Sequence, residues 1–128
     1  MINQPIQLFK LMYLALTKEW EKDKDEKLGL YLSEADPFVT GEDSADPVIF
    51  EDFLKAFNEY GSFEDFGYEF LIKYFEKLDP FFGDLKKFFI RISKQDYINE
   101  SEKYCIMTDE QLIDLFELYF KDESNQGN

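Results

Sequence analysis

The sequence predicts an all-α fold, a single-domain antiparallel bundle of five or six helices with an aromatic-rich core. Apolar residues recur at spacings of three and four along most of the chain, which is the period of a helix with one buried side. Strand signals are weak, because there is no sustained alternation of apolar and polar residues and no Asn-Gly or Asp-Gly hairpin turn. Fifteen Phe, eight Tyr and one Trp indicate that rings fill much of the core.

The first helix is predicted from a long apolar stripe near the N-terminus. Other apolar residues widen this stripe so far that we expect the helix to be central to the fold. The helix should end in the charged run 21–27, with Gly29 beyond it as a stop. The stripe consists of Ile6, Phe9, Tyr13, Leu16 and Trp20.

The tripeptide Ala-Asp-Pro occurs twice and marks two boundaries. Pro37 ends a turn or short helix formed by the preceding LYLSEA. Asp46 is predicted to cap a second long helix with Pro47 at its first position, where a missing N–H is tolerated. Gly61 should end this helix.

Two more helices are predicted between residues 62 and 94. Ser62, with Asp65 three residues later, is expected to cap a helix that ends before Pro80. An apolar stripe from Phe81 to Ile92 predicts the next helix. Its opposite side carries four cations, Lys86, Lys87, Arg91 and Lys94.

Thr108 and Gln111 form a capping box that should open the last helix, which we expect to reach Phe120. The fragment YCIM at 104–107 is the only one that resembles a strand. At 128 residues the chain can bury one core, so we expect a single helical domain over residues 1–122. The polar end, residues 123–128, predicts a disordered C-terminal tail.

The net charge of −14 is concentrated in two segments. Residues 33–65 carry ten acids and one lysine, and residues 108–128 carry six acids and one lysine, whereas the other segments are neutral. An acidic face repels phosphate backbones, so direct nucleic-acid binding is disfavoured. A basic protein partner would instead be steered toward it.

The residue types present exclude several chemistries. With no His and one Cys, the chain has neither a zinc ligand set nor a Ser–His or Cys–His pair. An EF-hand loop starting at Asp36 would place Phe38 and Pro47 at ligand positions, so it fails. No glycine-rich phosphate loop occurs. We therefore assign no catalytic residue, cofactor or metal, and interpret Cys105 as a small apolar residue.

No membrane segment is expected, because the most apolar run, LMYLALT, is far shorter than the roughly 20 residues that a spanning helix needs. The N-terminus also lacks the pattern of a secretory signal. A single cysteine fits a reducing compartment, so we expect a cytoplasmic protein.

The favoured hypothesis is a small acidic cytoplasmic binding protein that neutralises or sequesters a cationic protein partner. In physical type the chain is similar to bacterial immunity proteins, which are small, helical and acidic and bind the basic cleft of nuclease toxins, so a toxin domain is one such partner. The likeness is one of size, charge and helical character. Mimicry of DNA by the acidic face is a variant of the same hypothesis.

Two alternatives belong to other classes. One is a non-enzymatic helical adaptor or homodimerisation module, marked by exposed rings such as Phe81, Phe82 or Phe38. The other is a carboxylate-based metal protein or enzyme. The sequence does not determine the oligomeric state. The residues expected to contact a partner are Glu42, Asp43, Asp46, Glu51, Asp52, Glu59 and Tyr60, with Asp109, Asp114 and Glu117 as a second group.

Overall fold

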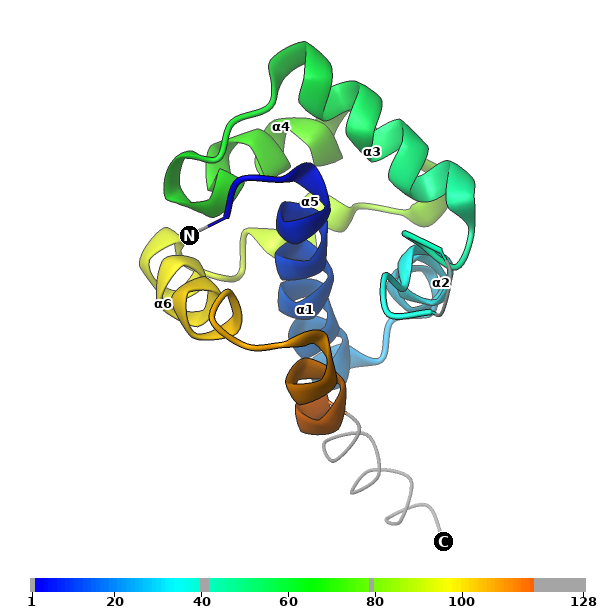
Figure 1. Cartoon of the computed structure of the whole chain (residues 1–128). Helices are drawn as coiled ribbons and strands as arrows, with labels where there is room; N and C mark the ends of the chain where they lie inside the picture. Colours follow the sequence, from blue (N-terminus) through cyan, green and yellow to red (C-terminus); the bar gives the residue numbers. More distant parts are fainter. Residues whose placement is uncertain (1, 40–41, 79, 117–128) are drawn as a thin grey trace, which may run out of the picture.

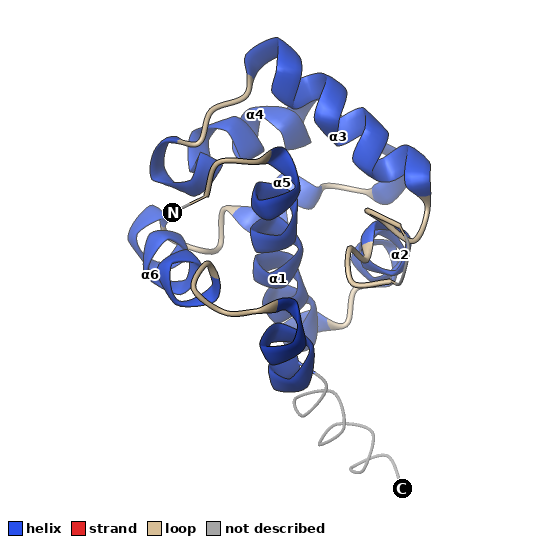
Figure 2. Cartoon of the chain, in the orientation of Figure 1, coloured by secondary structure: helices blue, strands red, loops and turns tan. Residues whose placement is uncertain are grey.

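The computed structural model describes residues 2–39, 42–78 and 80–116, which form helices joined by short loops, with no strand among them (Figures 1 and 2). None of the helices in these ranges is both long and apolar enough to cross a membrane. The predicted all-α bundle with an aromatic core is confirmed. The helices are α1 (Pro5–Asp23), α2 (Glu26–Ala35), α3 (Pro47–Tyr60), α4 (Tyr68–Lys77), α5 (Leu85–Phe89) and α6 (Lys94–Tyr104), followed by a helical segment at 109–116.

Helix α1 is the axis of the molecule, as its wide apolar stripe predicted. Figure 1 shows it in the middle, with α3 and α4 above it and α2 and α6 on either side. It packs against α2, α3, α5 and α6, so buried side chains occur all around the helix rather than on one stripe. They are Leu8, Phe9, Leu11, Met12, Leu14, Leu16, Thr17 and Glu19.

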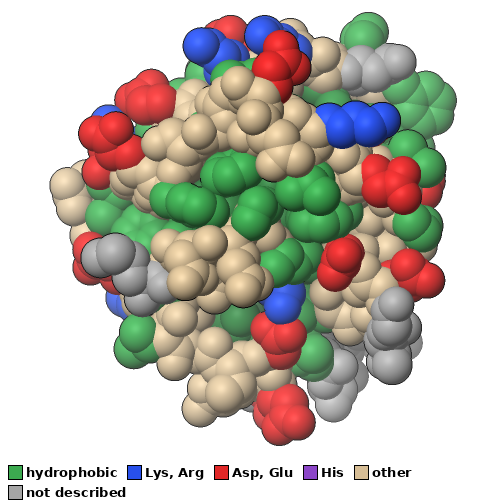
Figure 3. Space-filling view, turned by 45° about the horizontal axis from the view of Figure 1, so that its top comes forward, with side chains coloured by type: hydrophobic (Ala, Val, Ile, Leu, Met, Phe, Trp, Pro, Cys, Tyr) green, Lys and Arg blue, Asp and Glu red, His purple; other side chains and the backbone are tan. Residues whose placement is uncertain are grey.

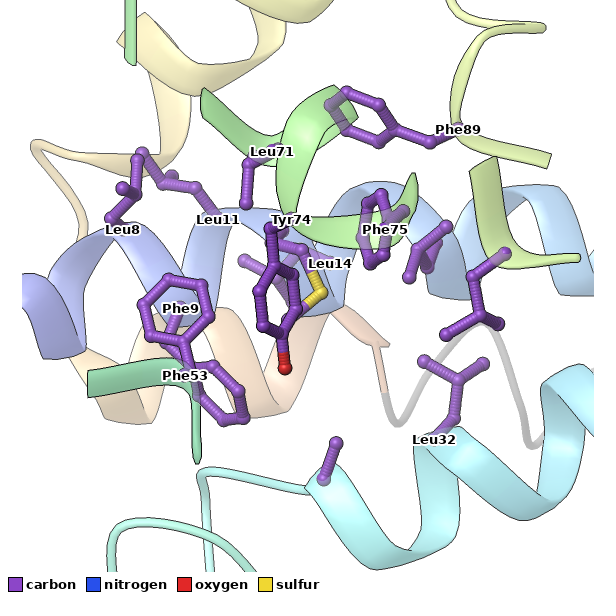
Figure 4. Close-up of a cluster of buried hydrophobic side chains, with 14 of the residues drawn as sticks. Leu8, Phe9, Leu11, Leu14, Leu32, Phe53, Leu71, Tyr74, Phe75 and Phe89 are labelled. Carbon is purple, nitrogen blue, oxygen red and sulfur yellow. The ribbon is translucent and has the colours of Figure 1, made fainter. Parts of the chain in front are cut away.

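Aromatic rings join α1, α3 and α4. The Phe53 ring lies 5.0 Å from Phe9 and 5.2 Å from Tyr74, both edge to face (Figure 4), and it lies 5.6 Å from Phe70. Each such pair contributes about 0.5–1.5 kcal/mol beyond the burial of its area. Phe53 therefore joins α3 to both α1 and α4.

The start of α3 is as predicted. The Asp46 carboxylate accepts a hydrogen bond from the Val48 N–H at 3.1 Å, and Pro47 is the first helical residue. The Asp46 N–H donates to the Glu34 carbonyl at 2.8 Å, which ties the start of α3 to the end of α2. Helix α2 ends at Ala35, as Pro37 predicted.

The capping box before the last helical segment is also confirmed. The Gln111 N–H donates to Thr108 Oγ1 at 3.1 Å, and the Thr108 N–H donates to Gln111 Oε1 at 2.9 Å. Phe120 and the predicted tail at 123–128 lie outside the described residues, as does the domain boundary at 122.

Gly29 does not act as a helix stop, which corrects the sequence-based prediction. Helix α1 already ends at Asp23, with Lys24 in a left-handed conformation, and Gly29 lies inside α2. A Cβ at Gly29 would come within 2.9 Å of Trp20 Nε1. A side chain at position 29 would collide with the Trp20 ring, which packs against Gly29. This contact joins two helices, so it cannot be recognised from the local sequence.

The helix predicted from Ser62 starts later than expected, at Tyr68. Residues Glu64–Gly67 form a 3-10 turn in which Asp65, Phe66 and Gly67 all have positive φ; we call this the left-handed turn. The Tyr97 hydroxyl of α6 donates to the Phe66 carbonyl at 2.8 Å. Tertiary contacts therefore stabilise a backbone that the capping pattern did not predict.

The single helix predicted from Phe81 to Ile92 is broken. A 3-10 turn (Pro80–Phe82) precedes α5, and α5 stops at Phe89. Helix α6 begins after Ser93, whose Oγ caps it by accepting from the Asp96 N–H, and it runs through Tyr104 of the strand-like fragment. With the segment 109–116, the described ranges hold seven α-helical segments, one more than the upper predicted number.

Replacing Gly67 with alanine should lower the free energy of unfolding by at least about 2 kcal/mol, because a left-handed side chain is strained and the new methyl group must displace a buried leucine. The φ of Gly67 is 75°, and a Cβ there would lie 2.6 Å from Leu8 Cδ1. Gly83→Ala is the control, because its φ is 77° but its Cβ would meet only the flexible Lys27 chain at 3.1 Å. If Gly67→Ala and Gly83→Ala lower the free energy of unfolding equally in chemical denaturation, the contact with Leu8 does not cause the loss.

Tyr97→Phe and Tyr31→Phe remove hydroxyl groups from two fully buried rings and should have different effects. Tyr97→Phe should lower the free energy of unfolding by about 1–2 kcal/mol, because it removes the bond to the Phe66 carbonyl. Tyr31→Phe should cost less, because no well-formed hydrogen bond joins the Tyr31 hydroxyl to a described residue and its polar neighbour is the Tyr74 hydroxyl. Urea denaturation of both variants tests this, and a larger loss for Tyr31→Phe would refute it.

Candidate functional site

The outer side of α3 carries three carboxylates with one lysine among them. Glu51, Asp52, Lys55 and Glu59 are exposed, and their spacing of three and four places them along one side of the helix. Among the described residues none of these four makes an ion pair, although Lys55 lies between the acids. Glu51 and Glu59 are eight residues apart, which is about 12 Å along the helix.

Two further acids are held at the N-terminal end of α3. The fully buried Ser44 side chain donates to the Asp46 carbonyl at 2.5 Å and accepts from the Phe50 N–H at 3.2 Å. These bonds tie the loop to the first turn of the helix, and they leave Glu42 and Asp43 exposed beside it. We define the acidic surface as Glu42, Asp43, Glu51, Asp52 and Glu59.

Unlike the carboxylates of the acidic surface, most acidic side chains on the other helices form an ion pair with a lysine or an arginine. Lys18 Nζ is 2.9 Å from Glu100, and Lys86 Nζ is 2.6 Å from Glu76. Arg91 pairs with Asp23. The four cations predicted to share one helix face are in fact divided between α5, the following turn and α6, and three of them pair with carboxylates. The acidic surface therefore gathers unpaired carboxylates on one helix and the loop before it, whereas other exposed carboxylates without an ion pair among the described residues, such as Glu26, Glu102 and Glu110, lie on separate elements.

Two of the predicted contact residues have a structural role. Asp46 is the cap of α3, and the Asp109 carboxylate lies 2.8 Å from Lys10 Nζ. Asp114 is exposed, but it belongs to the segment 109–116 rather than to α3. Glu117 lies outside the described residues.

Tyr60 is half-buried at the end of α3. Its ring lies 5.4 Å from the Phe70 ring, and Lys77 Nζ lies 4.5 Å from its ring centre. Burial, and then the nearby Glu59 carboxylate, raise the pKa of the Tyr60 hydroxyl. Tyr60 therefore lies at the edge of the acidic surface with a neutral hydroxyl group. The ammonium group of Lys77 lies over its ring.

A hollow of about 410 Å³ next to Tyr60 contains acids that sequence reasoning did not select. Glu64 is exposed there without an ion pair among the described residues. Lys94 Nζ lies 3.1 Å from both Asp65 and Glu69, and its hydrogen bonds to these two carboxylates raise its pKa. The sequence indicated Glu64 only through its place in the acid-rich segment 33–65.

A second groove, of about 340 Å³, lies between α1 and α6. Four cations border it, but each already pairs with a carboxylate: Lys18 and Lys103 with Glu100, Lys22 with Glu19, and Arg91 with Asp23. An anion bound there would have to displace these pairs. We therefore assign no ligand to the groove.

Within the described ranges, no group of three or more Asp, Glu or Cys side chains is arranged to hold a metal ion. The single cysteine, Cys105, is half-buried, and its Sγ donates to the Glu102 carbonyl at 3.4 Å. Comparison of the chain with protein-family models, curated proteins and solved structures found no match.

Lys18→Met should raise the pKa of the Glu100 carboxyl toward its ordinary value. The hydrogen bond from Lys18 is the largest cause of the low pKa of Glu100 in the folded protein. A lowered folded-state pKa stabilises the protein above the unfolded-state pKa, and this contribution is lost as the pH falls through the folded-state value. NMR titration of the glutamate side chains measures the shift.

Lys27→Met is the matched control, because Lys27 is exposed and makes no ion pair with any described residue. It should leave the pKa of Glu100 unchanged. An unchanged Glu100 pKa in Lys18→Met would show that the short Lys18–Glu100 contact does not persist in solution.

Proposed function

We propose that the protein binds a cationic protein partner through the acidic surface, and that binding neutralises or sequesters the partner. One observation carries this proposal: the five carboxylates of the acidic surface have no ion pair among the described residues, while most acids on α1, α4 and α6 have a basic neighbour. A charged surface without compensating cations attracts a partner of opposite charge.

Electrostatic attraction accounts for the speed and selectivity of such binding. Carboxylates spread over about 12 Å of one helix create a field that steers a basic surface toward α3. Like-charged molecules, including nucleic acids and other acidic proteins, are repelled by the same field. Association should therefore be fast at low salt and slow as ionic strength rises.

The physical type is that of an immunity protein that binds the basic cleft of a nuclease toxin. The likeness supports the class of partner, a folded domain with a cationic surface, and does not identify the toxin. Helix α3 suits this role because it is peripheral, with only Ile49 and Phe53 fully buried, and its acidic side faces solvent.

Neutralising the acidic surface tests the proposal. The triple variant Glu51→Gln, Asp52→Asn, Glu59→Gln should slow association with oligolysine, a simple cationic probe, on the order of tenfold at low salt, and it should flatten the salt dependence. Stopped-flow kinetics at several salt concentrations measure both quantities.

A second triple variant controls for net charge. Glu26→Gln, Glu102→Gln, Glu110→Gln removes three exposed carboxylates that make no ion pair with the described residues and lie on α2, α6 and the segment 109–116. It should slow association much less. Equal effects of the two triples would show that only total charge matters, and the acidic surface would then not be a site.

A further inference from the structure

Helix α6 is held to the rest of the molecule by few buried side chains. Only Tyr97, Ser101 and Tyr104 of its eleven residues are buried, and eight of the eleven are Lys, Gln, Asp, Asn, Glu or Ser. Helix α3 also buries few residues fully, but three more of its rings pack against the core, whereas Ile98 of α6 does not pack against the buried core of the described residues. An element with little buried apolar surface separates from the fold at a lower free energy than the core helices do.

Ion pairs connect α6 to three other elements. Lys94 Nζ, at the first residue of α6, lies 3.1 Å from Asp65 Oδ2 in the left-handed turn and 3.1 Å from Glu69 Oε1 of α4. Nearer the other end, Glu100 Oε2 lies 2.9 Å from Lys18 Nζ of α1. We define these three contacts as the α6 ion pairs. All five side chains are more than a third exposed, so dissolved ions reach them and screen their attraction.

The contact between α6 and α1 is not continuous along the two helices. The groove of about 340 Å³ lies between them, and it is lined by Leu11 and Ala15 on α1 and by Asp96 and Asn99 on α6. Figure 1 shows α6 at the outside of the molecule, beside α1. Short loops join α6 to α5 and to the segment 109–116. Helix α6 therefore forms one wall of the groove, and a movement of α6 away from α1 would widen it.

If α6 separates from α1, it does not remain a helix. Eleven residues are too few for a stable isolated helix in water, because nucleation costs more than the few hydrogen bonds return. The hydrogen bond from the Tyr97 hydroxyl to the Phe66 carbonyl would be lost at the same time. Separation is therefore a local unfolding, and the backbone N–H groups of α6 report it by exchanging with solvent.

We propose that α6 is a lid on the groove and that the α6 ion pairs hold it closed. Salt screens these pairs, so a rise in ionic strength shifts the lid toward an open state that exposes Leu11 and Ala15 of α1 to solvent. Ionic strength thereby controls access to the groove. The inference goes beyond the proposed function, because α6 carries none of the residues of the acidic surface.

Salt should act on the whole fold in the opposite direction. The net charge of −14 leaves an excess of repulsion in the folded chain, which lowers the free energy of global unfolding. Screening relieves this repulsion, whereas it weakens the attraction within the α6 ion pairs. The lid should therefore loosen under conditions that make the other helices more stable.

The apolar surface of the molecule supports no comparable proposal. Figure 3 shows apolar side chains gathered in a band across one face, with charged side chains toward its edges. Nothing in the structure indicates which molecule would cover this band, so we assign it no partner. The lid needs no partner, because every group that holds it closed belongs to the chain itself.

Hydrogen exchange of the backbone amides, followed by NMR at several salt concentrations, tests the lid. The amides of α6 should exchange by local opening, and the opening equilibrium should rise about tenfold between low salt and roughly 0.5 M sodium chloride, because three exposed ion pairs are screened. The amides of α2 are the internal control, because α2 makes no ion pair with the described residues. Their exchange should slow or stay unchanged.

Two double variants test whether the α6 ion pairs hold the lid. Lys18→Gln, Lys94→Gln removes the cation of each pair, so α6 should open about tenfold more often at low salt and lose most of its response to added salt. Lys27→Gln, Lys55→Gln is the matched control, because it removes the same charge from exposed lysines of α2 and α3 that make no ion pair with the described residues. It should leave the exchange of α6 unchanged.

Three results would overturn the inference. If the amides of α6 exchange only as slowly as the most protected amides of α1, α6 opens only when the whole chain unfolds and is not a lid. If the local opening of α6 does not rise with salt, or if the two double variants act alike, the α6 ion pairs do not hold it closed. The charge variants of the acidic surface test the proposed function separately, because their substitutions lie outside the α6 ion pairs.

Discussion

The fold depends on the burial of α1 from every side. A helix whose apolar side chains point in all directions is stable in water only when its neighbours cover it, and α2, α3, α5 and α6 each cover part of its surface. Helix α5 illustrates the constraint. Five residues are too few for a stable isolated helix, and α5 exists because Leu85, Phe88 and Phe89 are buried when it packs on α1 and α4.

The left-handed turn follows from the same constraint. The chain reverses close to Leu8, where only a residue without a side chain fits, and Gly67 occupies this position with a φ of 75°. The two preceding residues adopt an unfavourable backbone, which α6 stabilises through the Tyr97 hydroxyl and the Lys94–Asp65 pair. Elements distant in the sequence therefore hold the corner between α3 and α4.

Helix α3 differs from the other long helices in how little of it is covered. Because its buried side chains, Ile49 and Phe53, lie on one side of the helix, the side that carries Asp52, Lys55 and Glu59 remains exposed to solvent. Charge acts over a long range and gives speed and selectivity, whereas apolar contact acts only at short range and slows dissociation. The proposed binding of a cationic protein depends on the charged side of α3, which the stability of the fold does not explain.

The sequence by itself determined the all-α class, the central position of the first helix, both boundaries of α3 and the capping box at Thr108, because these follow from periodicity and from hydrogen bonds between residues a few positions apart. It also located the acid-rich segment that contains the acidic surface. Only the tertiary structure decided the role of Gly29, the left-handed turn and the break before α6, since each depends on a side chain from a distant element. The same holds for the candidate site. Whether a carboxylate such as Asp109 or Glu51 is paired depends on which lysine the fold brings near it, and whether Phe50 is covered depends on what packs beside it.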